Sequence, residues 1–216
     1  MKSVLLIGLG RFGRHMAIKL QALGHDILAI DQNEARVNNA LAIVTDAQIG
    51  DATDEAFIKT LGVRNFDLCV IAIGDDFQSS LEATSLIKDN GAPFVLARAA
   101  TDVHAKFLLR NGADDVIYPA QLAARYAAVR YTTDNVLDYT LLDDDYAVCE
   151  VNVPEAWQGQ SILELNVRGR YSISILLIKD AISGQTQTMP GPDHIFARGQ
   201  TMLVMGLNKD LQKFLK

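Results

Sequence analysis

The sequence contains few of the residues that mark disulfide-stabilised or membrane-spanning proteins. It has two cysteines in 216 residues, Cys69 and Cys149, and both lie inside apolar runs. We therefore expect buried thiols in a reducing compartment and no disulfide framework. The longest apolar runs, Leu68–Ile73 and Ile173–Ile178, are far shorter than the ~20 residues needed to cross a bilayer. Transmembrane helices are therefore not expected.

The sequence also lacks an excess of basic charge. Its 26 acidic residues outnumber 20 lysines and arginines, which gives a formal net charge of −6. Nonspecific nucleic-acid binding requires a basic face, so we expect no nucleic-acid partner. Met1-Lys2 stands directly before an apolar run, without the layout of a signal peptide. The expected location is therefore cytoplasmic.

What is abundant is apolar sequence, which makes up 49% of the residues. Over residues 1–133, short apolar runs alternate with segments in which apolar residues recur at helical spacing. This alternation predicts an α/β fold, a Rossmann-type doubly wound parallel sheet. The predicted strands are Ser3–Ile7, Ile27–Ile30, Ala47–Ile49, Leu68–Ile73, Phe94–Arg98 and Asp115–Tyr118.

The pattern changes after the polar stretch Thr132–Asn135, and residues 134–216 are predicted to form a small C-terminal α+β module. A module of this size buries little core by itself and would gain stability by pairing with a second copy. Its predicted strands are Ala147–Val153, Ser172–Lys179 and Thr201–Met205, and its predicted helices are Ser161–Leu165 and Lys209–Phe214.

A glycine-rich motif, G-x-G-x-x-G, follows the first predicted strand and opens the first predicted helix. Gly8 permits a tight turn, Gly10 lets the backbone approach a phosphate, and Gly13 lets the helix pack against the strand. The helix N-terminus offers N–H groups to that phosphate. Asp31 ends the second predicted strand, where its carboxylate can accept hydrogen bonds from ribose hydroxyls. The motif predicts a nucleotide site.

Two residues, Asp31 and Arg11, limit which nucleotide the site is expected to bind. Asp31 would repel a 2′-phosphate, and Gln32, Asn33 and Glu34 supply no cation, so NADP is not expected. Arg11 lies inside the glycine motif, where its guanidinium can reach the end of a phosphate chain. ATP has a terminal phosphate and NAD has none. The expected ligand is ATP or ADP, with NAD or NADH as the alternative, although a solvated Arg11 without a role also fits the sequence.

Further motifs join the glycine loop in a fixed order: Gly8–Gly13, Ala29–Asp31, Gly50–Asp54, Val70–Gly74, and Asn111–Asp114 with Val116–Pro119. Together they resemble the RCK (regulator of potassium conductance) family, of the KtrA/TrkA type. The stretch Ser161–Ile178 is similar to the C-terminal ligand-binding module of that family. The resemblance covers nearly the whole chain.

The resemblance implies a cytosolic regulatory subunit, part of a gating ring on a separate membrane potassium-transporting subunit, and hence peripheral to the inner face of the cell membrane. It implies homodimers that assemble into an octameric ring, whose shape is switched by nucleotides in the N-terminal domains. Transferred to this sequence, the nucleotide-site residues are Gly8, Gly10, Arg11, Phe12, Gly13, Asp31, Gln32, Asp51, Ala52, Thr53, Ala72, Gly74 and Arg98.

One position departs from the family pattern. Members that are activated by ATP with a cation often carry a glutamate after the proline that matches Pro119, and this chain has Ala120 there. A methyl group cannot coordinate a hard cation, which needs oxygen ligands. Activation by ATP together with a cation is therefore not expected, and no metal site is assigned.

The C-terminal module is expected to bind a second ligand, and cyclic di-AMP is the leading candidate. A two-fold pair of modules presents each residue twice and suits a two-fold symmetric ligand, and the family resemblance points to the same dinucleotide. Apolar side chains would face the adenines while Arg168 meets a phosphate; the alternative is that these side chains only pack a core beside a solvated Arg168. The assigned residues are Ile162, Leu163, Asn166, Arg168, Ile175 and Pro190.

An NAD-dependent oxidoreductase is the alternative function. Such an enzyme needs a proton donor and acceptor beside its substrate. The four histidines, His15, His25, His104 and His194, stand apart in the sequence and none belongs to a cluster of catalytic residue types. Because a fold alone does not set function, this absence decides the expectation: the protein is not an enzyme.

Overall fold

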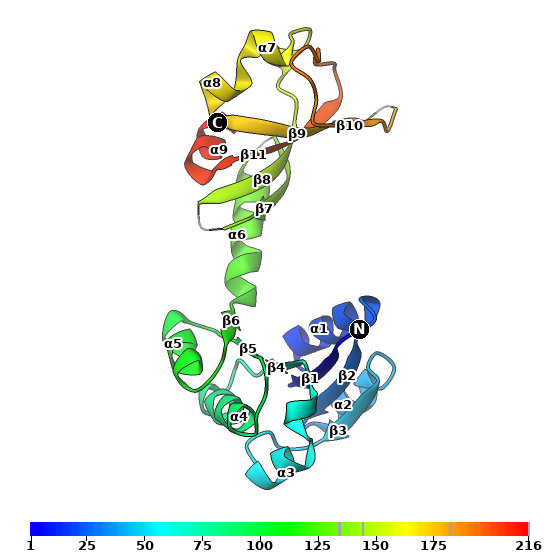
Figure 1. Ribbon diagram of the computed structural model, residues 1–216, viewed down its shortest axis with the longest axis vertical. Coiled ribbons are helices and arrows are strands. Elements are labelled where there is room, and N and C mark those ends of the chain that lie inside the picture. The colour runs from blue at the N-terminus through cyan, green and yellow to red at the C-terminus, as the bar shows by residue number, and fades with distance from the viewer. Residues whose placement is uncertain (134, 144, 182, 216) are drawn as a thin grey trace. The chain divides into compact units, whose positions relative to one another are not determined.

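The structure is a computed structural model that describes residues 1–133, 135–143, 145–181 and 183–215. The chain divides into two compact units, Met1–Gln121 and Leu122–Lys216 (Figure 1). Each unit has its own sheet and its own hydrophobic core. Within the described ranges, no helix is both long enough and apolar enough to cross a membrane.

The first unit is built on a six-stranded sheet in the order β3-β2-β1-β4-β5-β6. All neighbouring strands are parallel, which confirms the predicted Rossmann-type sheet. The strand order reverses beside β1, and ligands bind in the crevice at such a reversal. The strands are β1 (Ser3–Ile7), β2 (Asp26–Asp31), β3 (Asp46–Ile49), β4 (Leu68–Ile71), β5 (Val95–Arg98) and β6 (Asp115–Ile117).

Helices cover both faces of this sheet. Val4 and Leu6 of β1 join one core with α1 and α2, whereas Leu5 and Ile7 join the other with α3, α4 and α5. Because β1 is buried on both faces, its sequence is a continuous apolar run rather than an alternating one. The helices are α1 (Arg11–Ala22), α2 (Glu34–Ala40), α3 (Glu55–Thr60), α4 (Phe77–Asp89) and α5 (Asp102–Arg110), with a 3-10 turn at Val63–Asn65.

Side-chain caps begin four of these helices and are absent from the fifth. Asn33, Asp54, Asp76 and Thr101 each accept a backbone N–H from the first turn of α2, α3, α4 and α5, respectively. The N-cap of α1 is Gly10, and no side chain caps that helix. The first-turn N–H groups of α1 are therefore available to an external acceptor.

The second unit contains a five-stranded antiparallel sheet in the order β10-β9-β11-β8-β7. Trp157 lies at the centre of its aromatic core, with ring centroids 5.3 Å from Tyr171, 5.4 Å from Phe196 and 5.5 Å from Phe214. The elements are β7 (Val136–Leu141), β8 (Tyr146–Asn152), α7 (Ile162–Leu165), α8 (Val167–Tyr171), β9 (Ile173–Asp180), β10 (Thr186–Thr188), β11 (Gln200–Leu207) and α9 (Asn208–Phe214), with a 3-10 turn at Glu155–Trp157.

Helix α6 (Pro119–Thr132) explains why the unit boundary lies earlier than the predicted division at 133/134. Val129 packs against the core of the second unit, and Arg130 Nη1 donates to the backbone oxygen of Val136 at 2.6 Å. The helix therefore belongs to the second unit from Leu122 onward. Asp134, the first residue of the predicted C-terminal module, lies outside the described residues.

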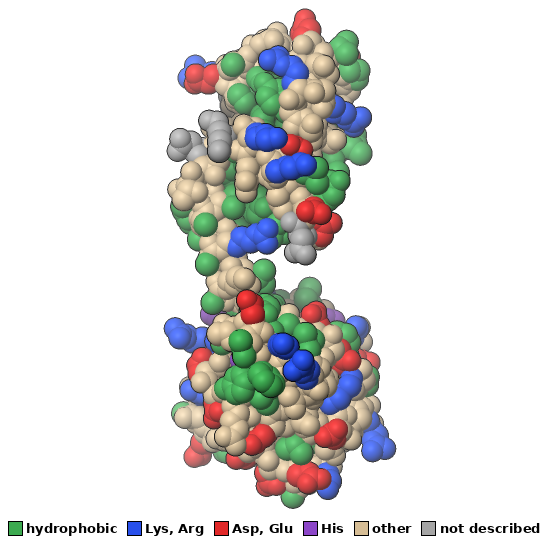
Figure 2. Space-filling model, turned by 90° about the vertical axis from the view of Figure 1, so that its left-hand side faces the viewer, with side chains coloured by type: hydrophobic (Ala, Val, Ile, Leu, Met, Phe, Trp, Pro, Cys, Tyr) green, Lys and Arg blue, Asp and Glu red, His purple; other side chains and the backbone are tan. Residues whose placement is uncertain are grey.

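Charged side chains of both signs are interspersed on the face drawn in Figure 2. Neither sign gathers there into a continuous patch, in keeping with the modest net charge of −6. The charge on this face therefore does not form the basic stripe that nonspecific nucleic-acid binding requires.

Candidate functional site

A cavity of about 740 Å³ opens at the carboxyl ends of the parallel strands in the first unit. It lies at the reversal of strand order, between the segments that follow β1 and β4. Every residue assigned to the nucleotide site except Gly13 lines it. The predicted residues that line the cavity are Gly8, Gly10, Arg11, Phe12, Asp31, Gln32, Asp51, Ala52, Thr53, Ala72, Gly74 and Arg98.

The three glycines of the motif serve different needs. Gly8 has φ +96°, a left-handed conformation that favours glycine, and its N–H donates to the Ile30 backbone oxygen at 2.8 Å. Gly13 is buried in α1, where an added Cβ would lie 1.8 Å from the Gly8 oxygen. At Gly10 an added Cβ would meet no atom within 4 Å. Packing within the protein therefore requires Gly8 and Gly13, but it does not require Gly10.

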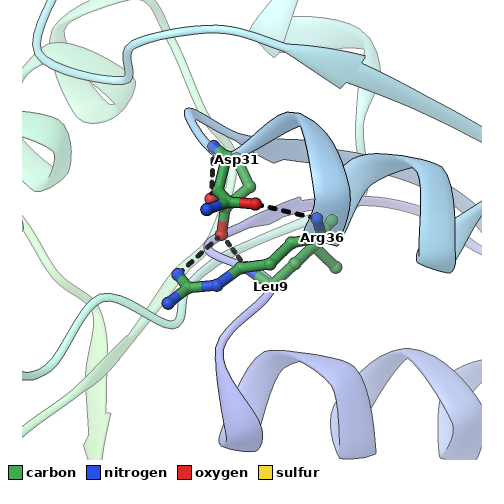
Figure 3. A network of polar contacts seen from close by, with 4 residues as sticks. Leu9, Asp31 and Arg36 are labelled. Atoms are coloured by element: carbon green, nitrogen blue, oxygen red, sulfur yellow. Dashed lines mark hydrogen bonds and ion pairs between the residues drawn. The ribbon is translucent and has the colours of Figure 1, made fainter.

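Asp31 is buried and anchors the glycine motif (Figure 3). The Leu9 N–H donates to Asp31 Oδ2 at 2.7 Å, and the Asn33 N–H donates to Oδ1 at 2.8 Å. Each carboxylate oxygen can accept more than one hydrogen bond. Asp31 thus fixes the loop after β1 and keeps acceptor capacity toward the cavity.

Arg36 lines the cavity beside Asp31 and was missed by the sequence analysis. Its Nη1 lies 3.5 Å from Asp31 Oδ2. Gln32, Asn33 and Glu34 supply no cation to the 2′ position of a ribose, but Arg36 does so from the first turn of α2. A helix that begins directly after the strand end could have revealed it, because its first turn lies over that end.

Asp51 and Thr53 form a local turn on the wall of the cavity. Asp51 Oδ1 accepts the backbone N–H of Thr53 at 2.8 Å and its hydroxyl at 2.7 Å. These two hydrogen bonds hold the pKa of Asp51 below its ordinary value. Asp51 is therefore a carboxylate at neutral pH, with one oxygen occupied by Thr53.

Arg98 crosses the cavity wall over Gly74. A Cβ at Gly74 would lie 2.6 Å from the Arg98 guanidinium carbon, so a side chain there would displace the arginine from this position. Arg98 Nη2 lies 3.4 Å from Asp75 Oδ1, and the Arg98 side chain is 25% exposed. The end of β5 thus supplies a third cation to the cavity, beside Arg11 and Arg36, and it is paired in this structure with an exposed carboxylate.

The N-terminus of α4 also reaches the cavity and was not assigned to it from the sequence. Asp75, Asp76 and Ser79 line this wall. Ser79 donates its hydroxyl to Asp76 Oδ2 at 2.7 Å and its N–H to Oδ1 at 3.1 Å, and these hydrogen bonds lower the pKa of Asp76. The other unassigned lining residues are Ile7, Ile30, Arg36, Gly50, Ile73, Pro119 and Ala120.

No histidine or cysteine is among the described residues that line the first cavity. His104 is buried, its Nδ1 accepts the Ala100 N–H at 3.3 Å, and burial followed by the charge of Arg98 lowers its pKa. Cys69 and Cys149 are buried thiols, as predicted, and burial raises the pKa of each to about 12. Across residues 1–133, 135–143, 145–181 and 183–215, no cluster of three histidine, cysteine or acidic side chains could hold a metal ion.

A second cavity, of about 320 Å³, lies within the second unit. Asn166 joins α7 to α8 in the left-handed conformation, with φ 46°. The Leu163 N–H donates to the Pro192 oxygen at 2.9 Å, which ties α7 to the proline-rich turn. The cavity is lined by all six residues assigned to the second ligand, Ile162, Leu163, Asn166, Arg168, Ile175 and Pro190, together with Val167, Ile173 and Pro192.

Comparisons with known proteins match both units. The model of the TrkA-N domain matches residues 4–119, and that of the TrkA-C domain matches residues 148–216. Ktr system potassium uptake protein A of Bacillus subtilis (strain 168) is 36% identical over 213 residues, 99% of this chain and 95% of the relative. The chain belongs to the RCK family, of the KtrA/TrkA type. Ktr system potassium uptake protein C of the same strain is 33% identical over 215 residues, 100% of this RCK chain and 96% of the relative.

Solved structures share the RCK fold at lower identity. The GsuK channel superposes with a TM-score of 0.69 at 19% identity, over 99% of this chain and 39% of the GsuK chain. The GsuK channel bound to NAD gives a TM-score of 0.67 at 19% identity, over the same shares of both chains. This RCK chain therefore spans less than half the length of those structures, and the likeness to them concerns the fold.

Proposed function

We propose that this RCK protein is a cytosolic regulatory subunit of a potassium channel or transporter, controlled by nucleotide binding. The observation that carries the proposal is the full-length match to Ktr system potassium uptake proteins A and C, over 99% and 100% of the chain. The first cavity supports control by a nucleotide. Gly10 lines it, and no contact within the protein requires a glycine there, whereas a phosphate that approaches the backbone does.

The proposed ligand of the first cavity is ATP or ADP, with NAD or NADH as the alternative. The uncapped N-terminus of α1 is suited to a phosphate, and Arg11 lines the cavity at that end. Asp31 would accept from the ribose, while Asp51, Ala52 and Thr53 would lie against the adenosine. Among proteins of similar fold, GsuK has been solved with NAD and with ADP, and a Shewanella denitrificans Kef C-terminal domain with AMP.

A cation is not part of the proposed site. Ala120 lines the cavity next to Pro119 and has no oxygen on its side chain to coordinate a metal. Nucleotide binding is therefore proposed to control the protein without a cation held at this position.

The proposed assembly is a homodimer that builds an octameric ring on a separate membrane potassium-transporting subunit. Such a subunit would lie in the cytoplasm, at the inner face of the cell membrane. No residue of α6 is buried within the chain, and Leu122 and Tyr126 are 51% and 44% exposed. A helix with exposed apolar side chains is suited to contact a second subunit.

The second cavity is proposed to bind cyclic di-AMP between two copies of the C-terminal module. Arg168 lies on its wall beside the apolar side chains of Ile162, Leu163 and Ile175. One cation with apolar walls matches a phosphate flanked by bases, and a two-fold pair of modules would supply both halves.

The function is tested by potassium uptake and the ligand by calorimetry. Deletion of the gene is expected to lower potassium uptake by the cell, and restoration of the wild-type chain is expected to recover it. The purified chain is titrated with ATP, ADP, NAD and NADH side by side. Turnover of NAD or NADH with a small hydroxy or carbonyl substrate would instead support the oxidoreductase alternative.

A further inference from the structure

Asp31 and Arg36 form an ion pair in the first cavity, but they differ in burial. The Asp31 side chain is 7% exposed, whereas the Arg36 side chain is 55% exposed. The 3.5 Å between Arg36 Nη1 and Asp31 Oδ2 is long for a charged hydrogen bond. In the described part of the chain, Asp31 is the one acceptor that the Arg36 guanidinium has. The arginine is therefore near the carboxylate but weakly held.

Asp31 itself is held firmly. The N–H groups of Leu9 and Asn33 bind its two oxygens at 2.7 and 2.8 Å, so it cannot turn without losing them (Figure 3). Arg36 carries no comparable restraint on its side chain, and its planar fork of N–H donors suits a phosphate. When a ligand enters, we therefore expect the Arg36 side chain to move and the Asp31 side chain to stay in place.

These two side chains present opposite chemistry to the same position of a ribose. In dinucleotide-binding folds, a carboxylate at the end of the second strand accepts from the 2′-hydroxyl, whereas a nearby arginine accommodates a 2′-phosphate. This chain has both groups in contact. Building on the proposed nucleotide function, we propose that Arg36 is a specificity-determining residue, which partly offsets the repulsion between Asp31 and a 2′-phosphate.

Arg36 and Asp31 therefore have opposite effects on the discrimination against a 2′-phosphate. Removal of Arg36 leaves Asp31 unopposed, so discrimination against a 2′-phosphate increases. Removal of the carboxylate leaves Arg36 available, so discrimination falls. The expected change for Arg36 is about tenfold, the size of one charged hydrogen bond at a half-exposed position.

The test uses AMP and adenosine 2′,5′-bisphosphate, which differ only at the 2′ position. Both dissociation constants are measured on the full chain by displacement of bound ADP, which extends to weak ligands. The variants are Arg36→Ala, Asp31→Ser, the double variant, and Arg14→Ala as a matched control. Arg14 is an exposed arginine of α1 whose Nη1 lies 3.4 Å from the Asn39 oxygen, outside the cavity lining.

The ratio of the two constants, bisphosphate over AMP, is expected to rise about tenfold in Arg36→Ala, to stay unchanged in Arg14→Ala, and to fall in Asp31→Ser. An equal ratio in Arg36→Ala and Arg14→Ala would overturn the inference. If wild type binds the bisphosphate too weakly to measure, Asp31→Ser and its double variant decide, because only the single variant should bind it. Thermal unfolding shows whether Asp31→Ser folds.

The outcome also separates this inference from the proposed function. Binding of AMP by wild type with a ratio that does not depend on Arg36 removes the inference alone. If wild type binds none of AMP, ADP, ATP and NAD, the proposed nucleotide function fails and the inference fails with it.

Discussion

Gly10 and Gly13 belong to one motif, but different partners require them. At Gly13 the space for a side chain is filled by the Gly8 oxygen, 1.8 Å from an added Cβ. At Gly10 that space is empty and opens into the cavity. The backbone of Gly10, with φ −64°, is one that any residue adopts. Gly13 is therefore needed for packing, whereas Gly10 is needed for ligand binding.

The first prediction compares Gly10→Ala with Gly13→Ala. Gly13→Ala should lower the free energy of unfolding by about 1–3 kcal/mol, because the methyl group is forced against backbone. Gly10→Ala should change it by at most about 1 kcal/mol, yet weaken nucleotide binding by about tenfold or more, because the methyl occupies the phosphate position. Chemical denaturation and calorimetry measure both quantities. Undiminished nucleotide affinity in a folded Gly10→Ala protein would contradict the assigned role.

Arg11 gives a second prediction at the residue scale. Its replacement by alanine should weaken the binding of ATP more than that of ADP or NAD, by about 1.5–3 kcal/mol for a lost charged hydrogen bond. The reason is that ATP alone among the three carries a γ-phosphate at the end of its phosphate chain. Titration of wild type and Arg11→Ala with all three ligands measures the difference. Equal weakening of the three would show that Arg11 does not contact the terminal phosphate.

At the scale of elements, the strands of the parallel sheet were predicted, whereas the two edge strands of the second sheet were not. Buried strands such as β1 are apolar throughout, and the structure places them within about two residues of the predicted bounds. β7, β10 and the short helix α8 were not predicted. All residues of β10 are exposed, and β7 carries exposed Asp138 and Thr140 beside a register shift. β7 alternates apolar and polar residues over residues 137–141, which is the signal of a half-buried strand, so its sequence did indicate it. The three residues of β10 are all polar and give no such signal.

The cavity shows a similar division between predictable and hidden residues. Gly8, Gly10, Arg11 and Asp31 were assigned from the glycine motif and from the end of the second strand. The other assigned residues were implied by the resemblance to the RCK family. Arg36 and Ser79 were not assigned, because each reaches the cavity from within a helix. Their placement depends on where the helix begins relative to the strand end, which is the least certain part of a sequence-based assignment.

Helix α6 carries the third prediction, on assembly. Leu122 and Tyr126 are exposed one turn apart, whereas Val129 of the same helix packs against the core of its own unit. Leu122→Glu with Tyr126→Glu should shift the protein to a smaller species by light scattering, because the charges would be buried at the subunit contact. Ala124→Glu with Ala128→Glu is the matched control, since both residues are exposed on another face of the helix. A wild-type monomer at micromolar concentration, with and without nucleotide, would remove the prediction.

At the scale of the whole molecule, the two cavities described above lie in different units and differ in kind. The first, about 740 Å³, has cations, carboxylates and a helix N-terminus along its wall. The second, about 320 Å³, is mainly apolar and is lined by one charged residue, Arg168. A volume near 300 Å³ is the lower limit for small-molecule sites. One copy of the second cavity therefore suits half of a symmetric dinucleotide better than a whole one.

The fourth prediction follows from that size. Cyclic di-AMP should bind the full chain at one ligand per two chains, because each copy supplies one apolar wall and one arginine. Arg168→Ala should weaken binding by about 1.5–3 kcal/mol per lost phosphate contact, and the dimer presents two. Arg170→Ala is the matched control: Arg170 lies on the same short helix, its guanidinium carbon is 5.7 Å from the Tyr171 ring centroid, and it does not line the cavity. Calorimetry gives both affinity and stoichiometry. Equal loss in the two variants would indicate a nonspecific charge effect, and no binding to a folded wild-type dimer would leave the second unit as an assembly domain alone.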